Sequence, residues 1–188
     1  MSVLSGSAPA LLLAAALVLP QAVPQTFDLV GTVSAGADAK GGITVPMTVS
    51  LERFTPDFER TKMTDGLKYN GYPGFLNALR DAPQVGTLEV AGEIFKIRWA
   101  RDVPNDGGRV ISLVTDQPVA FIGRGRRGAK PTAGYEVAVI QLTLDKTGHG
   151  TGLMAAAARV KPGGETGVRI DSYTEKPITL AVTLHGAS

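Results

Sequence analysis

The strict alternation of apolar and polar side chains in three segments is the feature that most limits what this chain can fold into. Apolar residues occupy every second position in residues 43–51, 95–99 and 178–184. Successive side chains of a β-strand point to opposite faces, so a period of two is typical of a strand with one buried and one exposed face. We expect further strands at residues 27–33, 85–91, 109–115, 119–123, 135–145, 151–160 and 167–172.

The segments between these strands are rich in turn-forming residues. Gly, Asn, Asp and Pro are frequent in residues 36–42, 105–108, 145–148 and 162–164. Such tight connections favour antiparallel pairing of neighbouring strands. The sequence therefore predicts a mainly β fold, an antiparallel barrel or sandwich of about nine or ten strands. Pro46 lies inside an alternating segment and predicts an edge position or a bulge, because proline has no N–H to donate to a neighbouring strand.

One segment departs from the β pattern and predicts a two-helix insertion around residues 56–81. It begins with Thr55 as a helix N-cap, followed by proline and by acidic residues in the first turn. The first helix is expected to run to Lys68, where Asn70-Gly71 and Pro73-Gly74 interrupt it. A second short helix is expected over residues 75–81, before Pro83.

The expected strand at residues 135–145 is apolar on both faces in its first half. A strand of this kind needs cover on both sides, and the helical insertion is the natural cover for one of them. Residues 155–158 are all alanine. We interpret them as part of a strand whose small side chains allow another element to pack closely.

An apolar run at residues 10–19 lies between Pro9 and Pro20. A membrane-spanning helix needs about 20 apolar residues, so this run is too short to span a bilayer, but it has the length of a signal-peptide core. We predict that residues 1–22 are a signal peptide and that residues 23–188 form a single β-rich domain. The protein is then exported to the periplasm or the exterior of a bacterial cell, with no transmembrane span.

Several chemistries find no support in the sequence. The chain has no cysteine, which excludes disulfides, thiolate zinc sites, iron–sulfur clusters and cysteine nucleophiles. Its two histidines, His149 and His185, lack the spacing of a helical zinc motif, and no G-x-S-x-G nucleophile elbow occurs. We therefore assign no catalytic residue, no metal and no cofactor. A pair of carboxylates for hydrolysis stays an open alternative, because the sequence does not place any two of them across a cleft.

Residues 123–128 form a literal G-x-G-x-x-G that follows a short apolar run. In dinucleotide-binding folds a helix starts at this motif, but Pro131 and Gly134 prevent one here, so the glycines are expected in a wide hairpin loop. The loop is basic, and its cationic residues predict contact with an anion or an anionic lipid. They are Arg124, Arg126, Arg127 and Lys130. The loop has no aromatic residue for stacking and the net charge is only +2, so we expect no nucleic-acid partner.

Large side chains in the insertion and in a strand expected to lie near it are candidates for a ligand cavity or for ordinary core packing. They are Tyr69, Tyr72, Phe95, Ile97 and Trp99. The leading hypothesis is an exported, non-enzymatic β-domain that binds a small apolar ligand or an envelope partner. The alternatives are a carboxylate-based hydrolase or isomerase that uses a barrel cavity, and a structural or assembly module that uses the basic loop.

Overall fold

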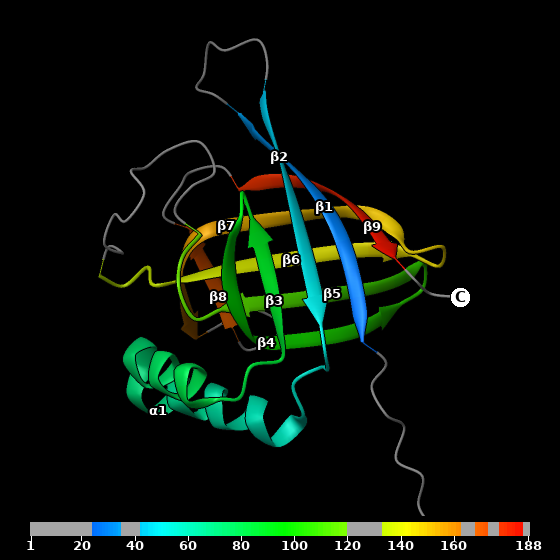
Figure 1. Ribbon diagram of the computed structural model, residues 1–188. Helices are drawn as coiled ribbons and strands as arrows, with labels where there is room; N and C mark the ends of the chain where they lie inside the picture. The colour runs from blue at the N-terminus through cyan, green and yellow to red at the C-terminus, as the bar shows by residue number, and fades with distance from the viewer. Residues whose placement is uncertain (1–23, 35–41, 120–132, 163–167, 173–176, 186–188) are drawn as a thin grey trace, which may run out of the picture.

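The computed structural model describes residues 24–34, 42–119, 133–162, 168–172 and 177–185. Within them it contains nine strands and one helical element (Figure 1). In chain order these are β1 Gln25–Ser34, β2 Gly42–Leu51, α1 Asp57–Asp81, β3 Gly86–Val90, β4 Glu93–Asn105, β5 Gly108–Thr115, β6 Val137–Asp145, β7 His149–Pro162, β8 Val168–Ser172 and β9 Ile178–His185.

Eight of the strands form a closed antiparallel barrel, which confirms the barrel prediction. The strands from β1 to β7 pair with their neighbours in chain order, and β9 closes the barrel by pairing with both β7 and β1. The short strand β8 pairs with the C-terminal part of β7, from Ala158 to Pro162. Pro46 of β2 lies opposite Val30 of β1 and just beyond the segment that pairs with β3. Within the described residues, Pro46 therefore has a partner strand on one side only, which is the local edge position that the sequence predicted.

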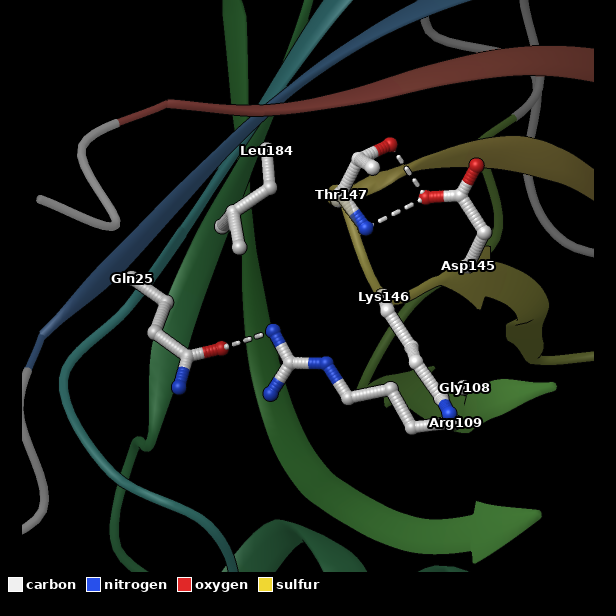
Figure 2. A pocket seen from close by; sticks show the side chains of 8 residues that line it. Gln25, Gly108, Arg109, Asp145, Lys146, Thr147 and Leu184 are labelled. Atoms are coloured by element: carbon white, nitrogen blue, oxygen red, sulfur yellow. Dashed lines mark hydrogen bonds between the residues drawn. The ribbon is translucent and has the colours of Figure 1, made fainter. Parts of the chain in front are cut away.

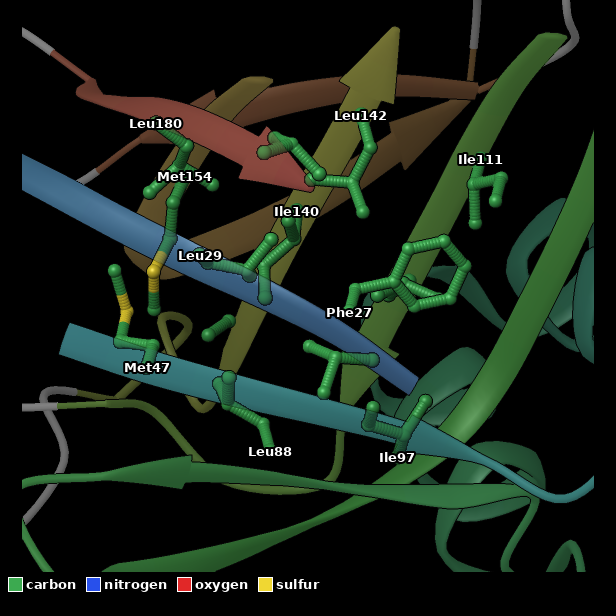
Figure 3. Packing of buried hydrophobic residues seen from close by; sticks show 14 of the residues in the cluster. Phe27, Leu29, Met47, Leu88, Ile97, Ile111, Ile140, Leu142, Met154 and Leu180 are labelled. Atoms are coloured by element: carbon green, nitrogen blue, oxygen red, sulfur yellow. The ribbon is translucent and has the colours of Figure 1, made fainter. Parts of the chain in front are cut away.

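The barrel interior is filled by side chains from all eight strands (Figure 3). Their inward positions follow the period-two pattern of the sequence, so that each strand contributes alternate residues. The largest fully buried members of this interior cluster are Phe27, Leu29, Leu88, Ile97, Ile111, Leu113, Ile140, Leu142 and Leu144. The interior is therefore a packed core, as in other barrels of this size.

The prediction of two separate helices is not confirmed, because residues 57–81 form a single helical element. This element is kinked at Gly71, whose φ of 65° and ψ of −160° are not helical. The chain folds back at the kink, so that the two arms of α1 meet at Gly66 and Gly74. A Cβ added at Gly74 would lie 2.5 Å from the Gly66 carbonyl oxygen. The absence of both side chains is what allows the two backbones to approach this closely.

Helix α1 packs against the outside of the barrel and forms a second core there. Helix residues Met63, Leu67 and Phe75 are in this cluster with Val137 and Val139 of β6. The first part of β6 is consequently buried on both faces, which confirms that this strand needed cover on both sides. Alanines 155 and 158 of β7 are also in the cluster. Their small side chains let α1 approach the sheet, as the sequence predicted.

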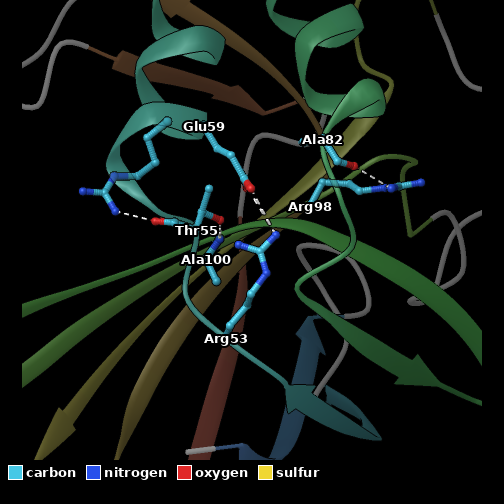
Figure 4. Close-up of polar contacts among 7 residues, drawn as sticks. Arg53, Thr55, Glu59, Ala82, Arg98 and Ala100 are labelled. Carbon is cyan, nitrogen blue, oxygen red and sulfur yellow. Dashed lines mark hydrogen bonds and ion pairs between the residues drawn. The ribbon is translucent and has the colours of Figure 1, made fainter. Parts of the chain in front are cut away.

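Thr55 joins the start of the helical segment to β4 instead of capping the helix. The N-cap position is Pro56, which makes no side-chain capping bond. The Ala100 N–H donates to the Thr55 hydroxyl at 2.8 Å, and the Thr55 N–H donates to the Ala100 carbonyl, also at 2.8 Å (Figure 4). At the other end of the insertion, Arg98 of β4 donates to the Ala82 carbonyl at 2.7 Å. Both ends of α1 are therefore fixed to the same strand.

Some expectations fall wholly or mainly outside the described residues. They are the signal peptide at residues 1–22 and most of the strand expected at residues 119–123. Val119 itself is described: it is buried in the interior cluster, and its N–H donates to the Ala156 carbonyl at 2.8 Å. Among the described residues, no helix combines the length and the apolar character that crossing a bilayer requires.

Candidate functional site

The five residues predicted to line a ligand cavity lie in three different environments. Phe95 and Ile97 are in the barrel interior, whereas Trp99 and Tyr72 are in the core beneath α1. Tyr69 is 69% exposed on the helix. The structure therefore does not bring the five together.

A β-bulge explains why Trp99 lies in a different core from Phe95 and Ile97, although the three residues share one alternating pattern. The pairing of β4 with β5 shifts register between Ile97 and Trp99. A bulge adds one residue to a strand, so the inward and outward positions exchange beyond it. Ala100 then enters the barrel interior, and Trp99 points outward into the core beneath the helix. The period of two in residues 95–99 contains no sign of this exchange.

The basic loop lies outside the described residues. Its predicted anion-contacting residues, Arg124, Arg126, Arg127 and Lys130, are all within residues 120–132, so their role stays a prediction.

A depression of about 660 Å³ lies at one end of the barrel (Figure 2). At this end the β4–β5 and β6–β7 hairpins meet the first residue of β1 and the C-terminal end of β9. The lining residues are Gln25, Gly108, Arg109, Asp145, Lys146, Thr147, Gly148 and Leu184. Most of the side chains here are polar or charged, and they come from both hairpins and from the two strands that close the barrel.

Arg109 reaches across the barrel end from β5 to β1, two strands on opposite sides of the barrel. Its guanidinium donates to the Gln25 side-chain oxygen at 2.9 Å and to Asp102 Oδ2 of β4 at 3.1 Å. The second Asp102 oxygen, Oδ1, is buried and has no hydrogen-bond partner among the described residues. The guanidinium is thus held in place from two sides, and these two bonds leave part of its donor capacity free.

Asp145 organises the β6–β7 hairpin at the edge of the depression. Its Oδ1 accepts hydrogen bonds from the Thr147 N–H at 2.8 Å, the Thr147 hydroxyl at 2.6 Å and the His149 N–H at 3.1 Å. These bonds favour the charged form of the carboxyl group, and the side-chain bond from Thr147 is the main cause that lowers the pKa of Asp145. The group is therefore suited to be a fixed negative charge that orders the turn.

Replacing Thr147 with valine should raise the pKa of Asp145 towards its ordinary value, because the largest stabilising bond to the carboxylate is lost. A carboxyl whose folded-state pKa is lowered stabilises the fold above its unfolded-state pKa, and this contribution disappears as the pH falls through the folded-state pKa. An NMR titration of the side-chain carboxyl carbon measures the change. Thr151→Val, at an exposed position of β7, is the control and should leave the pKa of Asp145 as it is. An unchanged pKa of Asp145 in Thr147→Val would show that the Thr147 hydroxyl is not the main cause of the lowered pKa.

A second polar group lies beside the core beneath α1. The Tyr72 hydroxyl accepts a hydrogen bond from the Glu136 N–H at 3.1 Å, and the Arg159 guanidinium carbon lies 5.5 Å from the centre of the Tyr72 ring. Burial raises the pKa of the Tyr72 phenol. Glu136 Oε1 accepts from the Gly134 N–H at 3.0 Å. These contacts join α1, β7 and the segment before β6, which is a structural role.

Both histidines are exposed on the barrel, and neither lines the depression. His185 Nε2 is 2.5 Å from Asp28 Oδ2, and His149 Nδ1 is 3.5 Å from the Thr183 hydroxyl. No group of three or more His, Cys, Asp or Glu side chains within the described residues is placed to hold a metal ion.

The barrel-end residues were not found from the sequence, which marked residues 105–108 and 145–148 only as turns. Arg109 and Gln25 are 84 positions apart, and neither belongs to a local motif. The only signals in the sequence were two basic residues, Arg109 directly after the first turn and Lys146 within the second.

Comparisons with protein-family models, curated proteins and solved structures gave no match.

Proposed function

We propose that this chain is an exported, non-enzymatic binding domain, in which a filled barrel is the scaffold and the barrel-end depression is the binding site. The proposal keeps the binding role inferred from the sequence but moves the site from the barrel interior to its end. The interior positions are occupied by side chains, whereas the concave surface at the barrel end leaves room for a small ligand within the described part of the chain.

One observation carries this proposal. The inward side chains of all eight strands form one buried cluster, whereas most of the side chains that line the depression are polar or charged. Binding sites combine apolar walls with a few fixed polar groups. Leu184 supplies an apolar wall here, and Arg109 is a polar group held by two partners. Asp145 has a lowered pKa, which suits a fixed charge better than a general acid.

Small neutral probes test the location of the site. Acetamide and isopropanol are titrated into the ¹⁵N-labelled mature chain, and the shifts of backbone amide signals are followed. We expect the largest shifts at Gly108, Thr147 and Gly148, with little change at the interior residues Leu113 and Ile140. The apolar dye N-phenyl-1-naphthylamine should show no saturable binding. Saturable binding of the dye at micromolar concentration, or shifts confined to interior residues, would contradict the proposal.

Export is tested separately by the mass of the denatured protein after expression with its own N-terminus in a bacterial host. Loss of roughly the first 22 residues is the expected result, since a signal peptide is removed on export. Recovery of the complete chain from the cytoplasm would contradict the export part of the proposal.

A further inference from the structure

We infer that the barrel-end depression selects small organic acids, and that it binds their carboxylate groups through Arg109 and Lys146. This inference rests on the proposed function, since it names the ligand class for the same site. It is carried by the position and the partners of the charged side chains around the depression.

Arg109 is prepared for a carboxylate by its position. Its guanidinium lies across the barrel end and is held by Gln25 on one side (Figure 2). Asp102 of β4 holds it on the other side. A guanidinium fixed in one orientation loses little conformational entropy when an anion binds. Its planar set of donors also matches the two oxygens of a carboxylate. The side chain retains 24% of its solvent exposure, so a ligand in the depression has access to it.

Lys146 adds a second positive charge from a different element. It lies in the β6–β7 hairpin and lines the depression, and within the described part of the chain it forms no ion pair. An ammonium group without a protein partner is available to an anion.

The one acidic side chain in the lining opposes an anion less than its charge alone suggests. Asp145 Oδ1 already accepts three hydrogen bonds from its own hairpin. Those donors partly compensate the negative charge where it is formed. The lining thus offers two cationic groups, of which Arg109 also pairs with Asp102, and one partly compensated carboxylate. Leu184 supplies an apolar surface beside them, which fits the short carbon skeleton of an organic acid better than a bare inorganic ion.

Succinate and succinamide provide a matched test, because they share a carbon skeleton and differ in charge. We expect succinate to shift the amide signals of Gly108, Lys146 and Gly148 in a saturable manner, with a weaker effect at high salt. Succinamide should bind at least tenfold more weakly. Lys146→Gln should weaken succinate binding by about threefold, the size expected for one partly exposed charge pair. Lys62→Gln, on the exposed face of α1, is the control and should bind succinate like the unmodified chain.

The outcomes separate this inference from the proposed function. Equal binding of succinate and succinamide at these amides would overturn the selection for acids, yet would leave the depression as a binding site. Equal binding of succinate and inorganic phosphate at matched ionic strength would overturn the assignment to organic acids. An unchanged affinity in Lys146→Gln would overturn the role of Lys146. The proposed function itself is overturned if the neutral probes also leave the barrel-end amides unaffected.

Discussion

Replacing Ile140 with alanine should lower the free energy of unfolding by about 4 kcal/mol, one of the largest effects expected for any single substitution in this chain. Ile140 is completely buried in the barrel interior. The first half of its strand β6 is also covered on the outer face by the core beneath α1. The backbone of β6 therefore has little freedom to move inward and fill the space. The loss therefore includes both the transfer energy of the removed atoms and the cost of a cavity. Equilibrium unfolding in urea measures it.

The matched control for this substitution is Ile94→Ala, since Ile94 is 66% exposed on β4. It should change the free energy of unfolding by less than about 0.5 kcal/mol. The pair also bears on function, because the barrel-end proposal depends on a tightly filled interior. A cost below about 1 kcal/mol for Ile140→Ala would mean that the interior adapts easily, and an internal ligand site would become the better proposal.

Replacing Gly74 with alanine should destabilise the protein by about 3 kcal/mol. The new Cβ would lie 2.5 Å from both the Gly66 carbonyl oxygen and the Asn70 Cβ. One of these neighbours is backbone and cannot rotate away, so the two arms of α1 would have to separate. Their separation would also disturb the core beneath the helix, where Phe75 and Leu79 are buried. Thermal unfolding followed by circular dichroism measures the effect.

Gly107→Ala is the control for general effects of adding a methyl group at a glycine. Gly107 lies in the β4–β5 turn, and the nearest atom to an added Cβ is 3.9 Å away. The melting temperature of this variant should stay close to that of the unmodified chain. If Gly74→Ala were as stable as Gly107→Ala, the close approach of the two helical arms would be refuted.

The strands were predictable because burial on one face imposes a local pattern. In residues 43–51 and 178–184 every second side chain is apolar, and the structure places these segments in β2 and β9. The need for an outer cover on β6 was also readable, because Val137 and Ala138 are apolar on opposite faces of one strand. Both inferences use only residues that are neighbours in the sequence, so they do not depend on how the strands are arranged in space.

The features that could not be predicted depend on geometry between distant segments. The bulge after Ile97 reverses which face Trp99 occupies, and it is set by pairing with β5. The interruption at Gly71 agrees with the sequence expectation, but the contact between Gly66 and Gly74, which holds the two helical arms together as one folded element, was not predicted. The candidate site depends on Arg109 meeting Gln25 across the barrel, which requires closure of the sheet by β9.

That closure has a consequence for how the chain must fold. The last strand, β9, lies between β1 and β7, so the barrel seam joins residues near both ends of the described chain. A ribosome makes β9 after the other eight strands, and until β9 is available β1 and β7 each present an open edge where another chain can pair. Contacts of such high sequence separation make folding slow. The barrel therefore closes only after β9 has been synthesised, and until then the nascent chain is most vulnerable to aggregation.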